Sequence, residues 1–125
     1  MTNRRAEEAR PNPKRGEIWM VDLDPTRGDE IRKRRPAVVV SSTGLGRLRL
    51  RVVIPLTSSW RGNLAASYWM VPIPASALNG LDRDTTADAF QVRSVSVERF
   101  TARRGQLEAE LLEQVVAALG IVVEV

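Results

Sequence analysis

Any chemistry in this chain must come from arginines, carboxylates and hydroxyls, because its 125 residues include neither histidine nor cysteine. That composition removes the usual acid–base residue, thiol nucleophiles and thiolate–zinc sites. The densest set of candidate groups is residues 29–36, DEIRKRRP, which lead directly into the apolar segment 37–40. Pro36 favours extended geometry at Arg35. A strand that follows a basic loop can hold a guanidinium against a phosphate.

The residues alone leave two interpretations of each candidate open. Charged side chains crowd the loop from Glu30 to Arg35, and such a run is either a solvated turn or a phosphate-contacting loop. Thr57 stands at a predicted strand end, where a threonine commonly caps a turn. Gln91 and Arg93 share one face of a predicted strand, as an exposed polar face or as a pair that reads bases.

The charge balance favours an anionic partner without proving one. The net charge is +4, the isoelectric point is about 10.6, and arginine supplies nearly all of the positive charge. Guanidinium groups suit bidentate phosphate binding. An arginine-rich genome would give the same composition without any nucleic-acid role.

We expect neither a metal nor a cofactor. The chain has no glycine-rich phosphate-binding loop. Asp22 and Asp24 are interpreted as strand-end and turn caps, while Asp82, Asp84 and Asp88 lack the glycine and terminal glutamate of a calcium loop.

The hydrophobic pattern predicts a mainly β fold, either a small barrel or a strongly bent antiparallel sheet, with one C-terminal helix. Residues 1–14 are interpreted as a flexible extension and 15–125 as one domain. Leu107 to Leu119 follow helical spacing, and Gly120 is the predicted end of that helix. The predicted strands span residues 17–23, 37–40, 47–54, 67–73, 85–92 and 95–98.

Two side-chain patterns predict where particular residues lie. In segment 47–54 the leucines at 48 and 50 share one face, and the arginines at 47, 49 and 51 form a solvated stripe on the other. Trp19 and Trp69 are expected in the core. Trp60, in a loop, is the better candidate for stacking on a base.

The chain shows no signal for a membrane or for export. No apolar run approaches the roughly 20 residues that span a bilayer. The charged N-terminus has no apolar stretch behind it. We therefore expect a cytoplasmic protein.

Taken together and in order, several segments resemble the MazF/PemK family of toxin endoribonucleases, from about residue 15 to the end. The matching pieces are RGEIWMVDLDPTRG at 15–28, Glu30, RPAVVV at 35–40, VIPLT at 53–57, QVR at 91–93, and the C-terminal helix.

The resemblance implies an SH3-like barrel with a helix, a homodimer, and metal-independent cleavage of single-stranded messenger RNA. It also implies an acidic MazE-like antitoxin as partner. By its motifs, Arg35 and Thr57 are catalytic, Glu30 matches the loop glutamate, and Gln91 and Arg93 contact RNA. Further RNA contacts are expected from Arg27, Lys33, Arg34 and Ser58. Phe90 departs from the family, in which many members carry an acidic residue before the glutamine.

A protein without histidine can cleave RNA because RNA carries its own nucleophile, the 2′-hydroxyl. In-line attack would leave a 2′,3′-cyclic phosphate and a 5′-hydroxyl. Arg35 would hold the phosphate oxygens and Thr57 would donate a further hydrogen bond. Guanidinium groups stay protonated in proteins, so Glu30 is chemically the better base, although it could instead orient Arg35.

Two rival functions remain open on the sequence. CcdB-like toxins share the fold and poison DNA gyrase, but this chain ends LGIVVEV, without the expected tryptophan. An RNA-binding barrel without catalysis is the third possibility.

Overall fold

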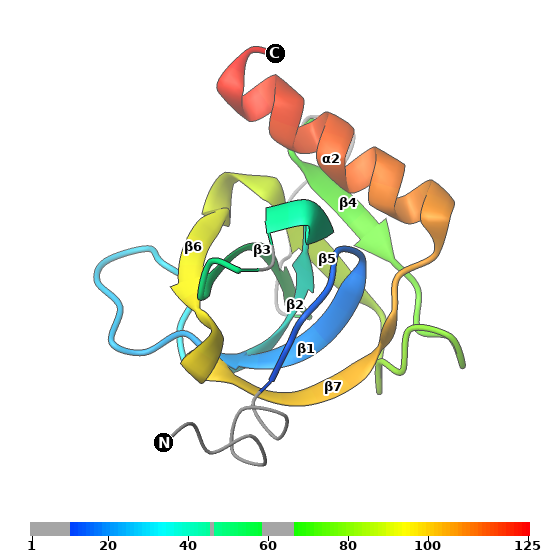
Figure 1. The fold of residues 1–125 in the computed structure, drawn as a ribbon. Helices are drawn as coiled ribbons and strands as arrows, with labels where there is room; N and C mark the ends of the chain where they lie inside the picture. Colours follow the sequence, from blue (N-terminus) through cyan, green and yellow to red (C-terminus); the bar gives the residue numbers. More distant parts are fainter. Residues whose placement is uncertain (1–10, 46, 59–66) are drawn as a thin grey trace, which may run out of the picture.

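The computed structural model describes residues 11–45, 47–58 and 67–125. They form a bent sheet with one long helix, α2, lying across one end beside β4 (Figure 1). The helix α2 spans Ala109–Val123, and short 3₁₀ turns are η1 (Thr43–Leu45), η3 (Ala89–Gln91) and η4 (Val97–Arg99). The strands are β1 (Glu17–Asp22), β2 (Arg34–Val39), β3 (Leu50–Thr57), β4 (Met70–Ile73), β5 (Thr85–Asp88), β6 (Arg93–Ser96) and β7 (Phe100–Gln106).

The sheet is antiparallel, in the order β4-β5-β3-β2-β1-β7, with β6 paired to β3 off this path. Strand β3 is the hub, because one part of it pairs with β2 and β6 and its end pairs with β5. In the described residues β4 and β7 remain edges. The prediction of a mainly β fold is confirmed. Of its two alternatives, the structure shows the strongly bent sheet, which does not close into a barrel in the described residues.

Two hydrophobic clusters hold this sheet together. The larger includes Ile18, Ile54 and Leu56 and is covered by α2 through Val115. The smaller includes Val21, Val53 and Phe100. Neighbouring residues of β3 thus enter different clusters, as expected for a strand buried on both faces.

Two of the three tryptophans pack as predicted. Trp19 stands edge-on to Phe100 with ring centroids 5.9 Å apart, and Trp69 packs against the larger cluster. Each is only partly buried. Trp60 lies outside the described residues.

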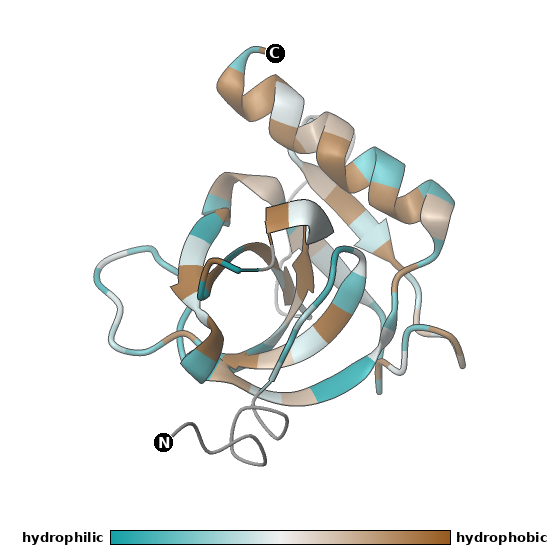
Figure 2. Cartoon of the chain, in the orientation of Figure 1, coloured by the Kyte–Doolittle hydropathy of each residue, from teal (hydrophilic) through white to brown (hydrophobic). Residues whose placement is uncertain are grey.

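Strand β7 was not predicted, because its pattern is that of an exposed edge. Only Phe100 and Gly105 are buried within it, and its arginines give it a hydrophilic stretch (Figure 2). Pairing with β1, from Glu17↔Gln106 to Val21↔Phe100, forms this strand. Tertiary pairing here overrides a weak local signal.

The predicted helix end at Gly120 is wrong. Helix α2 continues to Val123 and ends at Glu124, which has left-handed backbone angles. Val122 packs against the larger cluster, so the last turn is stabilised by burial.

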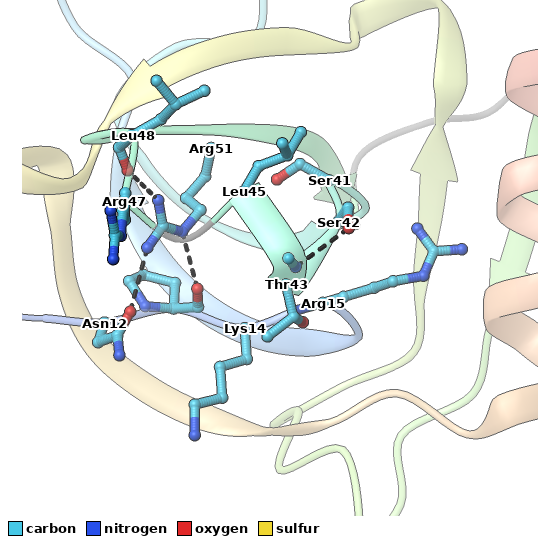
Figure 3. Close-up of a pocket in the computed structure, with 12 residues that line it drawn as sticks. Asn12, Lys14, Arg15, Ser41, Ser42, Thr43, Leu45, Arg47, Leu48 and Arg51 are labelled. Carbon is cyan, nitrogen blue, oxygen red and sulfur yellow. Dashed lines mark hydrogen bonds between the residues drawn. The ribbon is translucent and has the colours of Figure 1, made fainter.

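The prediction for segment 47–54 is wrong at its inner arginine. Strand β3 begins only at Leu50, and Leu48 and Leu50 are exposed, while Arg51 is 5% exposed. The Arg51 guanidinium donates to the carbonyls of Pro13 at 2.8 Å and Leu48 at 2.6 Å, and to Asn12 Oδ1 at 3.1 Å (Figure 3). A buried guanidinium is tolerated when its donors are satisfied in this way. Arg47 and Arg49 are exposed, as predicted.

The domain boundary near residue 14 stays a prediction, since residues 1–10 lie outside the described part. Within that part, Arg51 attaches Asn12 and Pro13 to β3. No helix among the described residues is long and apolar enough to cross a membrane.

Candidate functional site

Arg35 and Thr57 lie just past the same end of the β2–β3 ladder. Strands β2 and β3 pair through Val38↔Ile54 and Ala37↔Pro55. Arg35 precedes the last bridged residue of β2 by two positions, and Thr57 follows the last bridged residue of β3 by two positions. Arg34 and Arg35 lie within β2, opposite Asp22 and Val21, rather than in the predicted loop. The rigid platform expected after the loop therefore already includes Arg35.

The guanidinium of Arg35 has unused donors. Its Nε donates to the carbonyl of Arg32 at 3.2 Å. Within the described residues, its two terminal nitrogens have no hydrogen-bond or ion-pair partner. Arg35 is half-buried and lines a pocket of about 310 Å³ that Ser58 also lines. This places a fork of N–H donors at a pocket that a ligand could enter.

Thr57 is the last residue of β3 and is 9% exposed. Its backbone pairs with Thr86 of β5, which fixes its position in the sheet. Ser58 follows directly and is half-buried at the pocket. The structure thus brings Arg35 and Ser58 to one pocket, whereas Thr57, the residue before Ser58, is not among the residues that line it.

The loop between β1 and β2 projects from the sheet beside β6 (Figure 1) and is held by its own side chains. Asp24 Oδ1 accepts a hydrogen bond from Lys33 N at 3.1 Å, where Lys33 has φ of 68°. Glu30 Oε1 accepts one from Arg27 N at 2.7 Å. No ion pair joins Glu30 to Arg35 in the described part of the chain. Glu30 therefore shapes the loop.

The prediction that Gln91 and Arg93 share one strand face is wrong. Gln91 ends the turn η3, and Arg93 begins β6. The Gln91 side chain accepts from Ile31 N at 3.1 Å and donates to the carbonyl of Asp29 at 3.0 Å. Arg93 Nη1 donates to the carbonyl of Leu23 at 3.2 Å. Both residues hold the backbone of the loop that carries Glu30.

The turn before Gln91 is fixed by a buried carboxylate. Asp88 Oδ1 accepts from Phe90 N at 3.1 Å. Burial raises the pKa of Asp88 above its ordinary value, and backbone hydrogen bonds from Phe90 and Gln91 partly offset that rise. Phe90 itself is 65% exposed and stands edge-on to Trp69. The position at which this chain departs from the family therefore presents an aromatic ring to solvent beside Gln91.

Three further predicted RNA contacts form a basic rim along the β1–β2 loop and the start of β2. The side chains of Arg27, Lys33 and Arg34 are exposed and have no partner among the described residues. Their cations are available to a polyanion.

The aspartates that were weighed as metal ligands have other partners. Asp82 pairs with Arg104, and Asp84 Oδ1 accepts from Ala75 N at 2.8 Å. Asp22 Oδ1 accepts from Asp24 N at 3.1 Å. In the part of the chain that the structure describes, no three acidic side chains gather as a metal site.

Sequence reasoning missed most of the residues that line the Arg35 pocket, including two of its three arginines. Leu81 and Arg83, from the connection between β4 and β5, line it together with Arg104 of β7. The sequence places Arg83 in a predicted loop between Asp82 and Asp84, which gave no signal for a role at this pocket. Nothing local indicated Arg104, because β7 itself was not predicted.

Comparison with known proteins agrees with this geometry. Residues 14–123 match the family described as PemK-like, MazF-like toxin of type II toxin-antitoxin system. Endoribonuclease MazF9 of Mycobacterium tuberculosis is 42% identical over 113 residues, 85% of this chain and 92% of that protein. Endoribonuclease PemK of Escherichia coli is 44% identical over 85 residues, 67% of this chain and 59% of that protein. The crystal structure of MazF from Deinococcus radiodurans superposes with a TM-score of 0.78 at 26% identity, covering 92% of this chain and 99% of that one.

A bent antiparallel sheet with a C-terminal helix defines the class of this protein as a small, mainly β domain. The chain belongs to the PemK-like, MazF-like toxin family of type II toxin-antitoxin systems.

Proposed function

We propose that this protein is an endoribonuclease toxin that cleaves single-stranded messenger RNA at short sequences without a metal ion. One observation carries the proposal: within the described residues, Arg35 brings unpaired terminal nitrogens to a pocket that Ser58, the residue after Thr57, also lines. Two related proteins named endoribonucleases, at 42% and 44% identity, support it.

The reaction needs only positioning and charge stabilisation from the protein. The 2′-oxygen attacks the adjacent phosphorus while the bond from phosphorus to the 5′-oxygen breaks, leaving a 2′,3′-cyclic phosphate and a 5′-hydroxyl. The proton of the 2′-hydroxyl goes to a carboxylate base, and the leaving 5′-oxygen takes a proton from water. Arg35 donates hydrogen bonds from its two terminal nitrogens to the phosphorane oxygens, and Thr57 donates one from its hydroxyl.

Glu30 is the carboxylate of the loop that leads into Arg35. In the structure its Oε1 accepts from Arg27 N at 2.7 Å. Its other oxygen, Oε2, has no partner among the described residues and can take the 2′-proton while Oε1 holds the loop. We therefore assign Arg35 the role of phosphate clamp and Glu30 that of the base available to the loop.

The rest of the RNA path follows from charge. Arg27, Lys33 and Arg34 provide exposed cations, which would contribute affinity that falls as salt rises. Gln91 and Arg93 hold the loop by hydrogen bonds to its backbone and, in the complex, exchange these bonds for base contacts.

We further propose that the toxin acts in the cytoplasm as a homodimer and is inhibited by an acidic, MazE-like antitoxin. The family description names a toxin–antitoxin system, and an acidic segment suits the same basic rim. The protein encoded beside this toxin should co-purify with it, and adding that protein should stop cleavage. Undiminished cleavage in the presence of that neighbour would contradict this part.

The test of the activity is an RNA digest in EDTA. Pure protein should give discrete cuts with 5′-hydroxyl and cyclic phosphate ends. Inhibition of gyrase supercoiling without RNA cuts would instead indicate a CcdB-like gyrase poison. RNA binding with neither activity would indicate a binding module.

A further inference from the structure

The pocket at Arg35 extends beyond the groups assigned to cleavage. Its volume is about 310 Å³, at the lower end of the range of about 300–1000 Å³ for ligand pockets. Four of its lining residues are apolar: Met20, Pro36, Leu56 and Leu81. The basic lining residues are Arg35, Arg83 and Arg104. An apolar surface beside several guanidinium groups suits a nucleotide, whose base is apolar on its faces and whose phosphate is anionic.

The three arginines are in different electrostatic states. Arg104 Nη2 forms an ion pair with Asp82 at 2.8 Å and also donates to the carbonyl of Gly80 at 3.2 Å. Arg83 is exposed and has no hydrogen-bond or ion-pair partner among the described residues. Asp82 therefore offsets the charge of Arg104, and Arg83 remains as a second uncompensated cation beside Arg35.

The wall that carries Arg83 is held rigidly by Asn79. This side chain is fully buried, and its Oδ1 accepts from Ser76 N at 2.9 Å and from Leu81 N at 3.1 Å. Its Nδ2 donates to the carbonyl of Pro74 at 2.8 Å and to Glu108 Oε1 at 3.1 Å. A buried amide with this many partners fixes the backbone of the segment that leads to Arg83.

Close backbone contact attaches the same wall to β7. Gln106 N donates to the carbonyl of Leu78 at 3.0 Å. Gly80 has φ of +68°, and a Cβ there would lie 2.0 Å from the carbonyl oxygen of Arg104. The approach of loop and strand thus requires glycine. The pocket wall is pre-organised, which lowers the entropic cost of binding a ligand.

We propose that this pocket binds one nucleotide of the RNA next to the scissile phosphate, with Arg83 bound to the outer phosphate of that nucleotide. The proposal rests on the proposed ribonuclease function and adds a specific subsite to it. Arg35 and Arg83 would then hold two consecutive phosphates, one on each side of a base that lies on the half-buried apolar side chains of Met20 and Pro36.

The test measures RNA binding and cleavage separately. Arg83→Ala should raise the Kd of a 2′-O-methyl RNA, which cannot be cut, about tenfold at fixed salt. Arg49→Ala is the matched control, since it removes the same charge from an exposed arginine whose side chain has no partner in the described residues. It should change Kd less than about twofold. Equal effects of the two substitutions would overturn the subsite.

A methylphosphonate scan locates the contact. Neutralising one phosphate at a time should weaken binding by the wild-type protein at the scissile phosphate and at one neighbour. Arg83→Ala should be insensitive at that neighbour only; sensitivity equal to wild type at every position would overturn the assignment. A wild-type protein that binds RNA without cutting it would remove the proposed function, yet the Kd comparison would still decide the subsite.

Discussion

Two arginines at strand ends, Arg35 and Arg51, use the same guanidinium group in opposite ways. Arg51 is 5% exposed and donates to three carbonyls, those of Pro13, Leu48 and Leu50, at 2.6–2.9 Å. Arg35 makes one such bond, from Nε, and its terminal nitrogens face no partner in the described residues. A guanidinium whose donors are satisfied by the backbone stabilises the fold. One that keeps its terminal donors unpaired is available to a substrate.

The cavities beside these residues show the same difference. The cavity around Arg51 is larger, at about 520 Å³, and is lined by the segments near Asn12 and Ser42 (Figure 3). The cavity at Arg35 is about 310 Å³. Cavity volume alone would therefore point to Arg51. The terminal nitrogens of Arg35, unpaired among the described residues, are the reason to place the candidate site at the smaller cavity. Four predictions test this distinction.

Arg35→Ala should have the largest effect on activity. Removing the phosphate clamp should lower the single-turnover cleavage rate by at least about 10²-fold, as for a lost transition-state donor. Arg35 is half-buried at the pocket rather than in the core, so the thermal midpoint should change little. Cleavage by the folded variant at the wild-type rate would contradict the assignment.

Arg51→Met should act on stability instead. It leaves the carbonyls of Pro13 and Leu48 without a donor, which we expect to cost about 2–3 kcal/mol of unfolding free energy. Urea denaturation measures this cost, and Arg49→Ala, at an exposed site, serves as the control. A midpoint equal to that of the control would show that the Arg51 bonds add nothing.

Thr57→Val should lower the cleavage rate about tenfold, since a neutral hydroxyl is a weaker donor than a guanidinium. Valine keeps the shape of the side chain in this buried position. Thr57→Ser restores the hydroxyl and should recover most of the rate. If serine and valine are equally slow, the hydroxyl is not the group that matters.

Asp88→Asn should have the smallest effect, below about 1 kcal/mol. Burial raises the pKa of Asp88 in the folded protein above its ordinary value of 3.8. The folded protein therefore binds this proton more tightly than the unfolded chain does. The wild-type free energy of unfolding should therefore fall, relative to the variant, as pH rises from about 3.8 through the raised pKa. Parallel stability curves for the two proteins across this range would contradict the shift.

The arginine comparison also explains what the sequence could and could not predict. Local sequence patterns predict strand β1, the apolar part of β2 and helix α2. The choice of Arg35 as a candidate site residue comes from the RPAVVV motif. The burial of Arg51 could not be read locally, because its acceptors on Asn12 and Pro13 lie 39 and 38 residues away.

The rest of the pocket depended on the same kind of long-range contact. Arg104 belongs to β7, an edge strand in which only Phe100 and Gly105 are buried, so its sequence carries little strand pattern. Arg83 reaches the pocket only because Asn79 and Gly80 attach its loop to that strand. The role of Gln91 in holding the loop at Asp29 spans 62 residues and likewise has no local signal.

The most direct test of this account is one ratio measured in one assay. Arg35→Ala and Arg51→Met are compared for single-turnover cleavage of the same RNA in EDTA, each rate divided by the folded fraction. We expect the Arg35 variant to be at least about 10²-fold slower than the Arg51 variant, which should cleave near the wild-type rate. Equal rates would mean that the unpaired donors of Arg35 do not distinguish a catalytic arginine from a structural one.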